Sequence, residues 1–214
     1  MKYIFTIVLM LTLLFSLALS AQAAASIYVD RIWEGGESFT GTPDTNFNAS
    51  FISGGGMIGP VKIGAEYGSG TLKTVYGGSD LTLYNIKVGY RLLDAKASKL
   101  DVTISNLNLQ DKIGSAKFLE ADGDLLGLDF TQFFSKRTFF SLTYQSAWTE
   151  SFKIPPGLIS LKDDSISVIR AKLGYFFSEN AGVTIGFTDL VVKSNDAHIQ
   201  LAFNAYTAGM VFKF

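Results

Sequence analysis

Residues 83–92 read Leu-Tyr-Asn-Ile-Lys-Val-Gly-Tyr-Arg-Leu, and their polarity alternates one residue at a time. Even-numbered positions from 84 to 92 are apolar or aromatic, while odd-numbered positions from 85 to 91 carry Asn, Lys, Gly and Arg. Successive side chains of a β-strand point to opposite faces, whereas a helix would scatter Lys87 and Arg91 among the apolar positions. The segment is therefore predicted to be a β-strand with one apolar and one polar face.

The same alternation recurs along the chain. It is found in residues 26–33, 46–51, 61–67, 100–105, 126–130, 140–149, 169–177, 183–188 and 199–214. Short predicted connections (53–57, a glycine turn; 94–98; 135–137; 178–180) alternate with longer ones (34–44; 70–80; 108–122; 150–163; 192–197). Short and long connections alternate in this way in antiparallel up-and-down barrels of the outer membrane. We predict such an all-β transmembrane barrel with ten strands, or with eight if the first hairpin lies outside the wall.

Composition favours a membrane-embedded wall over a soluble β-sandwich or lipocalin-like barrel. Charged residues make up 17% of the chain and aromatic residues 14%, and the mean hydropathy is +0.26. In typical soluble domains, about a quarter of the residues are charged. After residue 24, no apolar run is long enough to span a bilayer as a helix. A chain that is apolar overall but lacks apolar runs is typical of membrane β-strands.

The N-terminus is typical of a secretory signal peptide. Lys2 precedes an apolar stretch over residues 3–19, and Ala21-Gln22-Ala23 fits a small-x-small cleavage site. A retained membrane helix is the alternative, but no stop-transfer charges follow the stretch. We therefore expect residues 1–23 to be a cleaved signal peptide and residues 24–214 to form the barrel.

Charge and cysteine content narrow the range of partners. Without Lys2 the chain has 17 basic and 19 acidic residues, which gives no electrostatic reason to expect nucleic acid as a partner. The chain has no cysteine, which excludes disulfides and thiolate metal sites. The sequence predicts neither a metal site nor a cofactor.

The chain ends in Thr207-Ala208-Gly209-Met210-Val211-Phe212-Lys213-Phe214. In Thr207, Gly209, Phe212 and Phe214 this ending resembles the closing strand of the outer-membrane β-barrel superfamily of Gram-negative bacteria. The resemblance implies a location in the bacterial outer membrane, surrounded by its lipid. It also implies that periplasmic chaperones and the barrel-assembly machinery are partners, the latter by recognising these four residues. We expect a monomer.

The polar faces of the strands supply the candidate lumen. The predicted lumen-lining charges are Lys62, Glu66, Lys87, Arg91, Asp101, Asp129, Arg170 and Lys172. An interior sealed by salt bridges and a narrow water-filled passage both fit these residues, because unpaired buried charges are costly. Barrels of eight strands are just filled by side chains, whereas sixteen strands leave a channel, so ten strands favour a plugged or very narrow lumen.

Three classes of function remain open. The first is a structural or narrow-channel, porin-like barrel. The second is a surface binding or adhesion module that acts through exterior loops, particularly residues 108–122 and 150–163. The third is a lipid-modifying enzyme or a protease, but the chain has a single histidine, His198, and no motif joins it to Asp196 or to Asp163 and Asp164. We therefore predict no enzymatic activity.

Two segments change the phase of their alternation. In residues 100–109 the apolar positions are even up to Ile104 and odd from Leu107, and in residues 199–214 they are odd up to Phe203 and even from Tyr206. A β-bulge would produce such a change, and so would a strand that projects above the bilayer. The sequence leaves both explanations open.

Overall fold

A computed structural model of the chain describes residues 25–39, 45–74, 77–113, 116–153, 160–161, 164–194 and 199–214. The strands are β1 (Ala25–Phe39), β2 (Thr45–Ile58), β3 (Val61–Thr74), β4 (Gly77–Asp94), β5 (Ser98–Ile113), β6 (Ala116–Phe133), β7 (Thr138–Lys153), β8 (Ser160–Leu161), β9 (Asp164–Phe176), β10 (Ala181–Ser194) and β11 (Ile199–Lys213). Among the described residues, no helix is long and apolar enough to cross a membrane. The predicted signal peptide lies outside the described residues.

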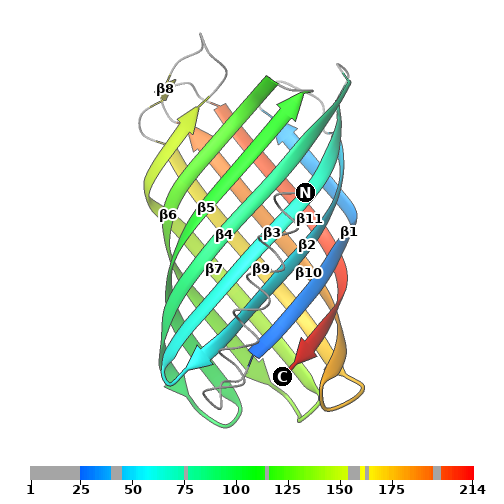
Figure 1. Cartoon of the computed structure of the whole chain (residues 1–214), viewed down its shortest axis with the longest axis vertical. Helices are drawn as coiled ribbons and strands as arrows, with labels where there is room; N and C mark the ends of the chain where they lie inside the picture. The colour runs from blue at the N-terminus through cyan, green and yellow to red at the C-terminus, as the bar shows by residue number, and fades with distance from the viewer. Residues whose placement is uncertain are drawn as a thin grey trace.

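The strands close into a barrel (Figure 1). Apart from the two-residue β8, each strand pairs antiparallel with its neighbours in chain order, and β11 pairs with β1 to complete the ring. The predicted ten-stranded up-and-down barrel is confirmed, and the first hairpin belongs to its wall. Closure leaves the wall without an unpaired edge.

Four tight turns and the C-terminus share one end of the barrel, which is the periplasmic end in outer-membrane barrels. The turn between β2 and β3 contains Gly59, whose φ of 59° suits glycine. The predicted glycine turn at residues 53–57 is wrong, because these residues belong to β2. A Cβ at Gly55 would lie 2.8 Å from the carbonyl oxygen of Ile63 on β3, so this glycine allows close strand approach.

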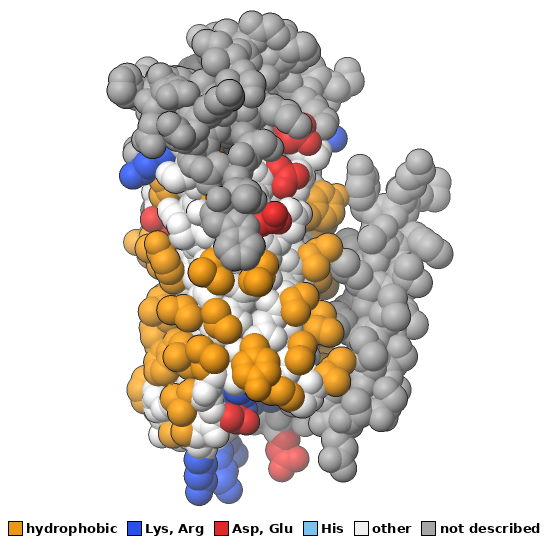
Figure 2. Space-filling model, turned by 90° about the vertical axis from the view of Figure 1, so that its left-hand side faces the viewer, with side chains coloured by type: hydrophobic (Ala, Val, Ile, Leu, Met, Phe, Trp, Pro, Cys, Tyr) orange, Lys and Arg blue, Asp and Glu red, His pale blue; other side chains and the backbone are white. Residues whose placement is uncertain are grey.

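A belt of apolar side chains covers the outside of the periplasmic half (Figure 2). Ile86 is 53% exposed and Ile104 49%, although both lie in the middle of strands. Aromatic side chains fall at both margins of the belt: Tyr67, Tyr84, Tyr144, Phe187 and Tyr206 at the upper margin, and Tyr90, Phe134, Tyr175, Phe177 and Phe214 at the lower. Such girdles mark the two interfaces of a bilayer. We conclude that the belt faces lipid.

Above the belt the wall continues as an extension, in which polar side chains face outward and apolar side chains face the lumen. The wall strands are 13–18 residues long, whereas about 9–11 residues of a tilted strand cross a bilayer. In the upper part of β5, Asn106 and Asn108 point outward, while Leu107 and Leu109 are 1% and 0% exposed. Here the outer face meets water, so the apolar side chains turn into the barrel.

This inversion explains the phase changes. β5 pairs with β4 and β6 without interruption through Ile104 and Leu107, and β11 pairs with β10 without interruption from Ile199 to Phe212. The bulges occur elsewhere, for example beside Ile32 in β1 and Arg91 in β4. Both segments therefore change phase because the strand leaves the bilayer, and not because an extra residue is inserted.

The predicted long connections are correspondingly too long. Most of the residues predicted as loops at 34–44, 70–80, 108–122 and 192–197 are paired strand residues of the extension, and β7 reaches Lys153 within 150–163. In these segments the polar residues face outward and the apolar residues face inward. A prediction that expects apolar residues only on the outer face therefore takes them for polar loops. Strand β8 pairs with the end of β7.

Candidate functional site in the barrel lumen

The lower half of the lumen holds a network of charges centred on Asp129. Its carboxylate accepts hydrogen bonds from Lys62 Nζ at 2.8 Å, from Lys87 Nζ at 3.0 Å and from Thr143 Oγ1 at 2.7 Å. Lys62 also pairs with Asp101 at 3.0 Å. Because Asp129 is buried, the two ammonium groups supply the charge that compensates its carboxylate.

Arg91 and Asp101 form a second pair beside this network. The guanidinium also reaches Asp94, the last residue of β4, at 3.2 Å and the Met57 sulfur at 3.3 Å. Asp101 therefore joins Lys62 to Arg91, and β3, β4, β5 and β6 are connected through one chain of ion pairs.

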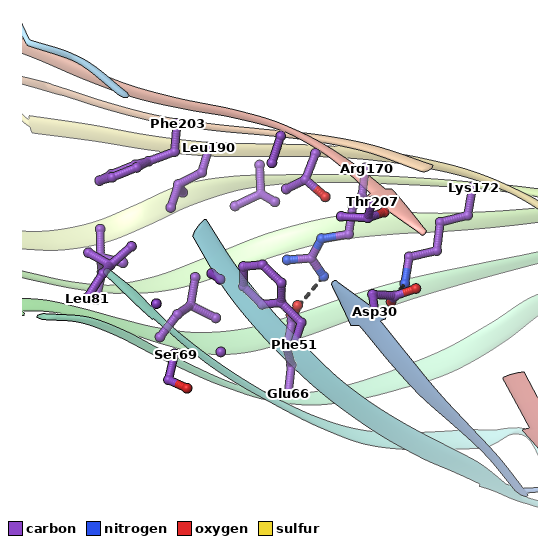
Figure 3. A pocket seen from close by; sticks show the side chains of 18 residues that line it. Asp30, Phe51, Glu66, Ser69, Leu81, Arg170, Lys172, Leu190, Phe203 and Thr207 are labelled. Carbon is purple, nitrogen blue, oxygen red and sulfur yellow. Dashed lines mark hydrogen bonds and ion pairs between the residues drawn. The ribbon is translucent and has the colours of Figure 1, made fainter. Parts of the chain in front are cut away.

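A single ion pair crosses the middle of the lumen. Arg170 Nη1 on β9 donates to Glu66 Oε2 on β3 at 2.7 Å (Figure 3). In the ring of ten strands, β3 and β9 are five places apart, which puts them on opposite walls. The Glu66–Arg170 pair is therefore a bar across the diameter of the barrel.

Asp30 is a lumen carboxylate that the sequence reasoning missed. It pairs with Lys172 and accepts a hydrogen bond from Thr184 Oγ1 at 3.0 Å. Lys172 also lies 4.9 Å from the ring centre of Tyr28. The alternation of Ser26, Tyr28 and Asp30 with the apolar Ile27 and Val29 was the signal that could have identified this carboxylate.

All eight predicted lumen charges thus face the interior and line one cavity, which we call the vestibule. Its volume is about 360 Å³, and it extends from the Glu66–Arg170 bar to the periplasmic end of the wall. Above its network, Gln145 Nε2 donates to Ser105 Oγ at 2.8 Å, which forms a neutral polar layer. A second cavity of about 40 Å³ lies beyond the bar and shares Glu66, Arg170 and Lys172 with the vestibule (Figure 3).

The outer half of the lumen is filled by a cluster that we call the apolar plug. It consists of Ile32, Ala49, Leu81, Leu83, Leu107, Leu109, Ala121, Leu125, Ile166, Val168, Leu190, Val192, Phe203 and Ala205. Each of these side chains is at most 6% exposed. Asp111 follows on the inner face of β5 above Leu109, where burial raises the pKa of its carboxyl.

The four residues of the terminal motif differ in their surroundings. Phe212 and Phe214 lie at the lower margin of the belt, whereas Thr207 is buried in the lumen. A Cβ at Gly209 would collide with the Asp30 carboxylate and with the Val29 carbonyl oxygen. Gly209 therefore leaves room for the Asp30–Lys172 pair, in addition to any part it has in recognition.

Replacing Gly209 with alanine tests this steric role. Because backbone atoms block the added methyl group, we expect a loss of about 1–3 kcal/mol in the free energy of unfolding. Refolding from urea into detergent micelles, without any assembly factor, measures it. Ala208→Gly, one residue away, is the control for the alanine–glycine difference. A Gly209→Ala barrel of unchanged stability in micelles but poor assembly in cells would assign the residue to recognition alone.

The residues considered for catalysis are not brought together by any described part of the structure. Asp163, Asp196 and His198 lie outside the described residues. Within the described ranges, no group of three His, Cys, Asp or Glu side chains is arranged to hold a metal ion. The absence of enzymatic activity stays a prediction.

Comparison with known proteins shows a shared fold. The outer-membrane protease OmpT from Escherichia coli has a TM-score of 0.59 and 12% identity over 91% of this chain and 98% of that chain. Neisserial surface protein A gives 0.48 and 11% over 91% and 98%, and an outer-membrane channel from Pseudomonas putida F1 gives 0.47 and 11% over 90% and 95%. No family model matches the chain, and no curated protein does.

At these identities the likeness shows the fold alone, which is that of outer-membrane β-barrel proteins. The lipid-facing belt is an independent observation, because an apolar surface that encircles a closed barrel is stable only in a bilayer. Together the fold and the belt place the chain in the bacterial outer membrane.

Proposed function

We propose that this protein is a structural barrel of the outer membrane whose lumen is closed to solutes. The observation that carries the proposal is the apolar plug, which fills the outer half of the lumen with fully buried side chains such as Leu107, Leu109 and Leu125. A porin-like passage would need polar groups along its whole length to replace the hydration shell of an ion. Among the described residues, the layer of the lumen directly beyond the Glu66–Arg170 bar is lined mainly by the apolar side chains of the plug.

The free volume supports closure as well. The cavity beyond the Glu66–Arg170 bar measures about 40 Å³, which is room for about two or three water molecules. Its upper walls are formed by Leu81, Leu190 and Phe203, which offer water no hydrogen-bond partner (Figure 3). Ions do not enter a constriction of this kind, because dehydration is not compensated there.

The closed lumen predicts silence in planar lipid bilayers. Purified protein, shown to be folded by heat-modifiable gel migration, is expected to give no unitary openings at moderate voltages. Stable openings of uniform size would contradict the proposal. They would favour the narrow passage if their ion selectivity also shifted in Lys87→Gln or Arg170→Gln variants, whose parent side chains line the vestibule.

A second candidate function is surface recognition by the extension. The observation that favours it is the polar outer face of the β5–β6 hairpin, where Asn106 donates to Asp124 at 3.0 Å and Asn108 donates to Asp122 at 3.2 Å. A face ordered by side-chain hydrogen bonds above the bilayer can present fixed groups to another molecule. Binding of barrel-bearing vesicles to arrays of matrix proteins and glycans, lost when this hairpin is shortened, would support this function.

The partners implied by the terminal motif remain part of the proposal. The exposed aromatic ring of Phe214 is accessible to the barrel-assembly machinery, and Gly209 is needed for packing against β1. Both fit a terminal strand that is recognised during assembly and then packed into the wall. The single chain closes its own sheet, which supports a monomer. We assign no catalytic step to the barrel.

A further inference from the structure

The vestibule has more cationic side chains than its carboxylates can neutralise. Its lining contains the side chains of Lys62, Lys87, Arg91, Arg170, Lys172 and also Lys99 and Lys213, which lie toward the periplasmic mouth. The facing side-chain carboxylates are Glu66, Asp101 and Asp129, together with Asp30 behind Lys172. The surplus positive charge is at the mouth, because the deeper cations are all paired.

Lys99 and Lys213 share an unusual setting at this mouth. Both ammonium groups lie 5.7 Å from the ring centre of Phe133, and Lys213 Nζ lies 3.6 Å from the ring centre of Phe176. Among the described residues Lys213 forms no ion pair, and Lys99 has only a long contact of 3.9 Å with the exposed Asp94. Two like charges are thus gathered beside one ring without a carboxylate between them.

The same mouth has an aromatic wall. Phe133 and Phe139 have their ring centres 6.2 Å apart, and Phe139 and Phe176 5.4 Å apart. Phe139 and Phe176 are only 3% exposed, so they support Phe133, whose half-buried ring supplies the accessible apolar surface. This surface adjoins the two ammonium groups. Two neighbouring ammonium groups beside an apolar ring are complementary to a molecule that has an anionic group and a flat apolar body.

We propose that the vestibule is a binding site for small organic carboxylates that enter from the periplasm. The carboxylate lies between Lys99 and Lys213, and the apolar body lies against the half-buried ring of Phe133. The volume of about 360 Å³ is at the small end of the range for ligand pockets, which suits a molecule of roughly ten to twenty non-hydrogen atoms. The site does not depend on closure of the plug, because its lining lies below the Glu66–Arg170 bar.

Methionine methyl resonances provide a direct test with an internal control. Of the methionines after residue 24, Met57 lines the vestibule and Met210 is 43% exposed on the belt. In protein labelled with ¹³C at the methionine methyl groups, benzoate should shift the Met57 signal saturably and leave Met210 unchanged. Benzylammonium, which has the same ring and the opposite charge, should shift neither signal.

Variants connect the binding to the two lysines. Lys99→Gln with Lys213→Gln should weaken the benzoate affinity at least tenfold, whereas Lys96→Gln with Lys136→Gln, in the exposed turns, should change it less than twofold. Should the first double variant not fold, Lys99→Gln alone should weaken the affinity severalfold. Unchanged affinity in the folded Lys99 variants would overturn the proposal, as would a Met57 signal that benzoate does not shift. Inorganic phosphate binding as tightly as benzoate would overturn the role of the rings.

Discussion

Replacing Asp129 with alanine is expected to lower the free energy of unfolding by about 3 kcal/mol, because Lys62 and Lys87 lose their shared counter-charge. The vestibule can hydrate the released ammonium groups in part, which keeps the loss at the lower end of the range for buried ion pairs. Urea unfolding in phospholipid vesicles, followed by gel migration, measures the change.

Two further variants distinguish a broken network from a general effect of mutation. Asp124 lies on the same strand but outside the barrel, so Asp124→Ala is expected to cost less than about 1 kcal/mol. Adding Lys87→Met to Asp129→Ala should recover part of the stability, because it removes a charge that has become unpaired. Equal losses in the Asp129 and Asp124 variants would show that the lumen network contributes little.

Opening the plug is expected to convert a silent barrel into a conducting one. Leu109→Ser, Leu190→Ser and Phe203→Ser, combined in one protein, introduce hydroxyl groups and space at the small cavity beyond the Glu66–Arg170 bar. Water and ions should then pass, with anions favoured over cations because the vestibule has a cationic surplus. Single-channel recording in planar bilayers measures both effects.

The matched control uses the outward-facing neighbours of the same three residues. Asn108→Ser, Asp189→Ser and Asn204→Ser alter the outer face of the extension and leave the plug intact. This protein should remain silent. The plug variant will be less stable, since each large-to-small change in a core costs several kcal/mol, so folding is verified first by gel migration. Silence in a folded plug variant would place the barrier elsewhere, at the Glu66–Arg170 bar.

The lower half of the barrel could be predicted from the sequence because one rule governs it. Lipid outside and water or polar groups inside impose a strict period of two, so Lys87 and Arg91 were assigned to the lumen and Ile86 and Val88 to the outer face. The closing strand and the number of strands followed from the same rule. The predicted lumen residues share a cavity because the wall is closed, so the polar faces of neighbouring strands all point to the same interior.

The upper half could not be predicted from that rule, because its surroundings are different. Above Ile104 the outer face meets water, and the same alternation places Leu107 and Leu109 inside. In the sequence, such a pattern resembles a membrane strand that ends early and is followed by a polar loop. No single residue marks the height at which the bilayer ends. Asp30 was missed for a related reason, since the polarity of the first strand inverts directly after it, with Arg31 exposed and Ile32 buried.

Pairing across the lumen is also beyond sequence reasoning. Glu66 and Arg170 meet although 104 positions separate them, because strand order and tilt bring opposite walls to the same height. Alternation assigns each residue to a face but gives no height along the barrel. Which cations remain unpaired, such as Lys213, becomes visible only when the heights are known.

The most direct test of the account is the reactivity of single cysteines along β5 in vesicles. The chain has no cysteine of its own, so each introduced thiol is unique. We expect cysteine at Ile104 to react only with a lipid-soluble reagent, cysteine at Asn106 or Asn108 to react rapidly with a charged reagent, and cysteine at Leu107 or Leu109 to react with neither. Rapid reaction of position 107 or 109 with the charged reagent would reveal a water-filled lumen and contradict the closed, inverted upper half.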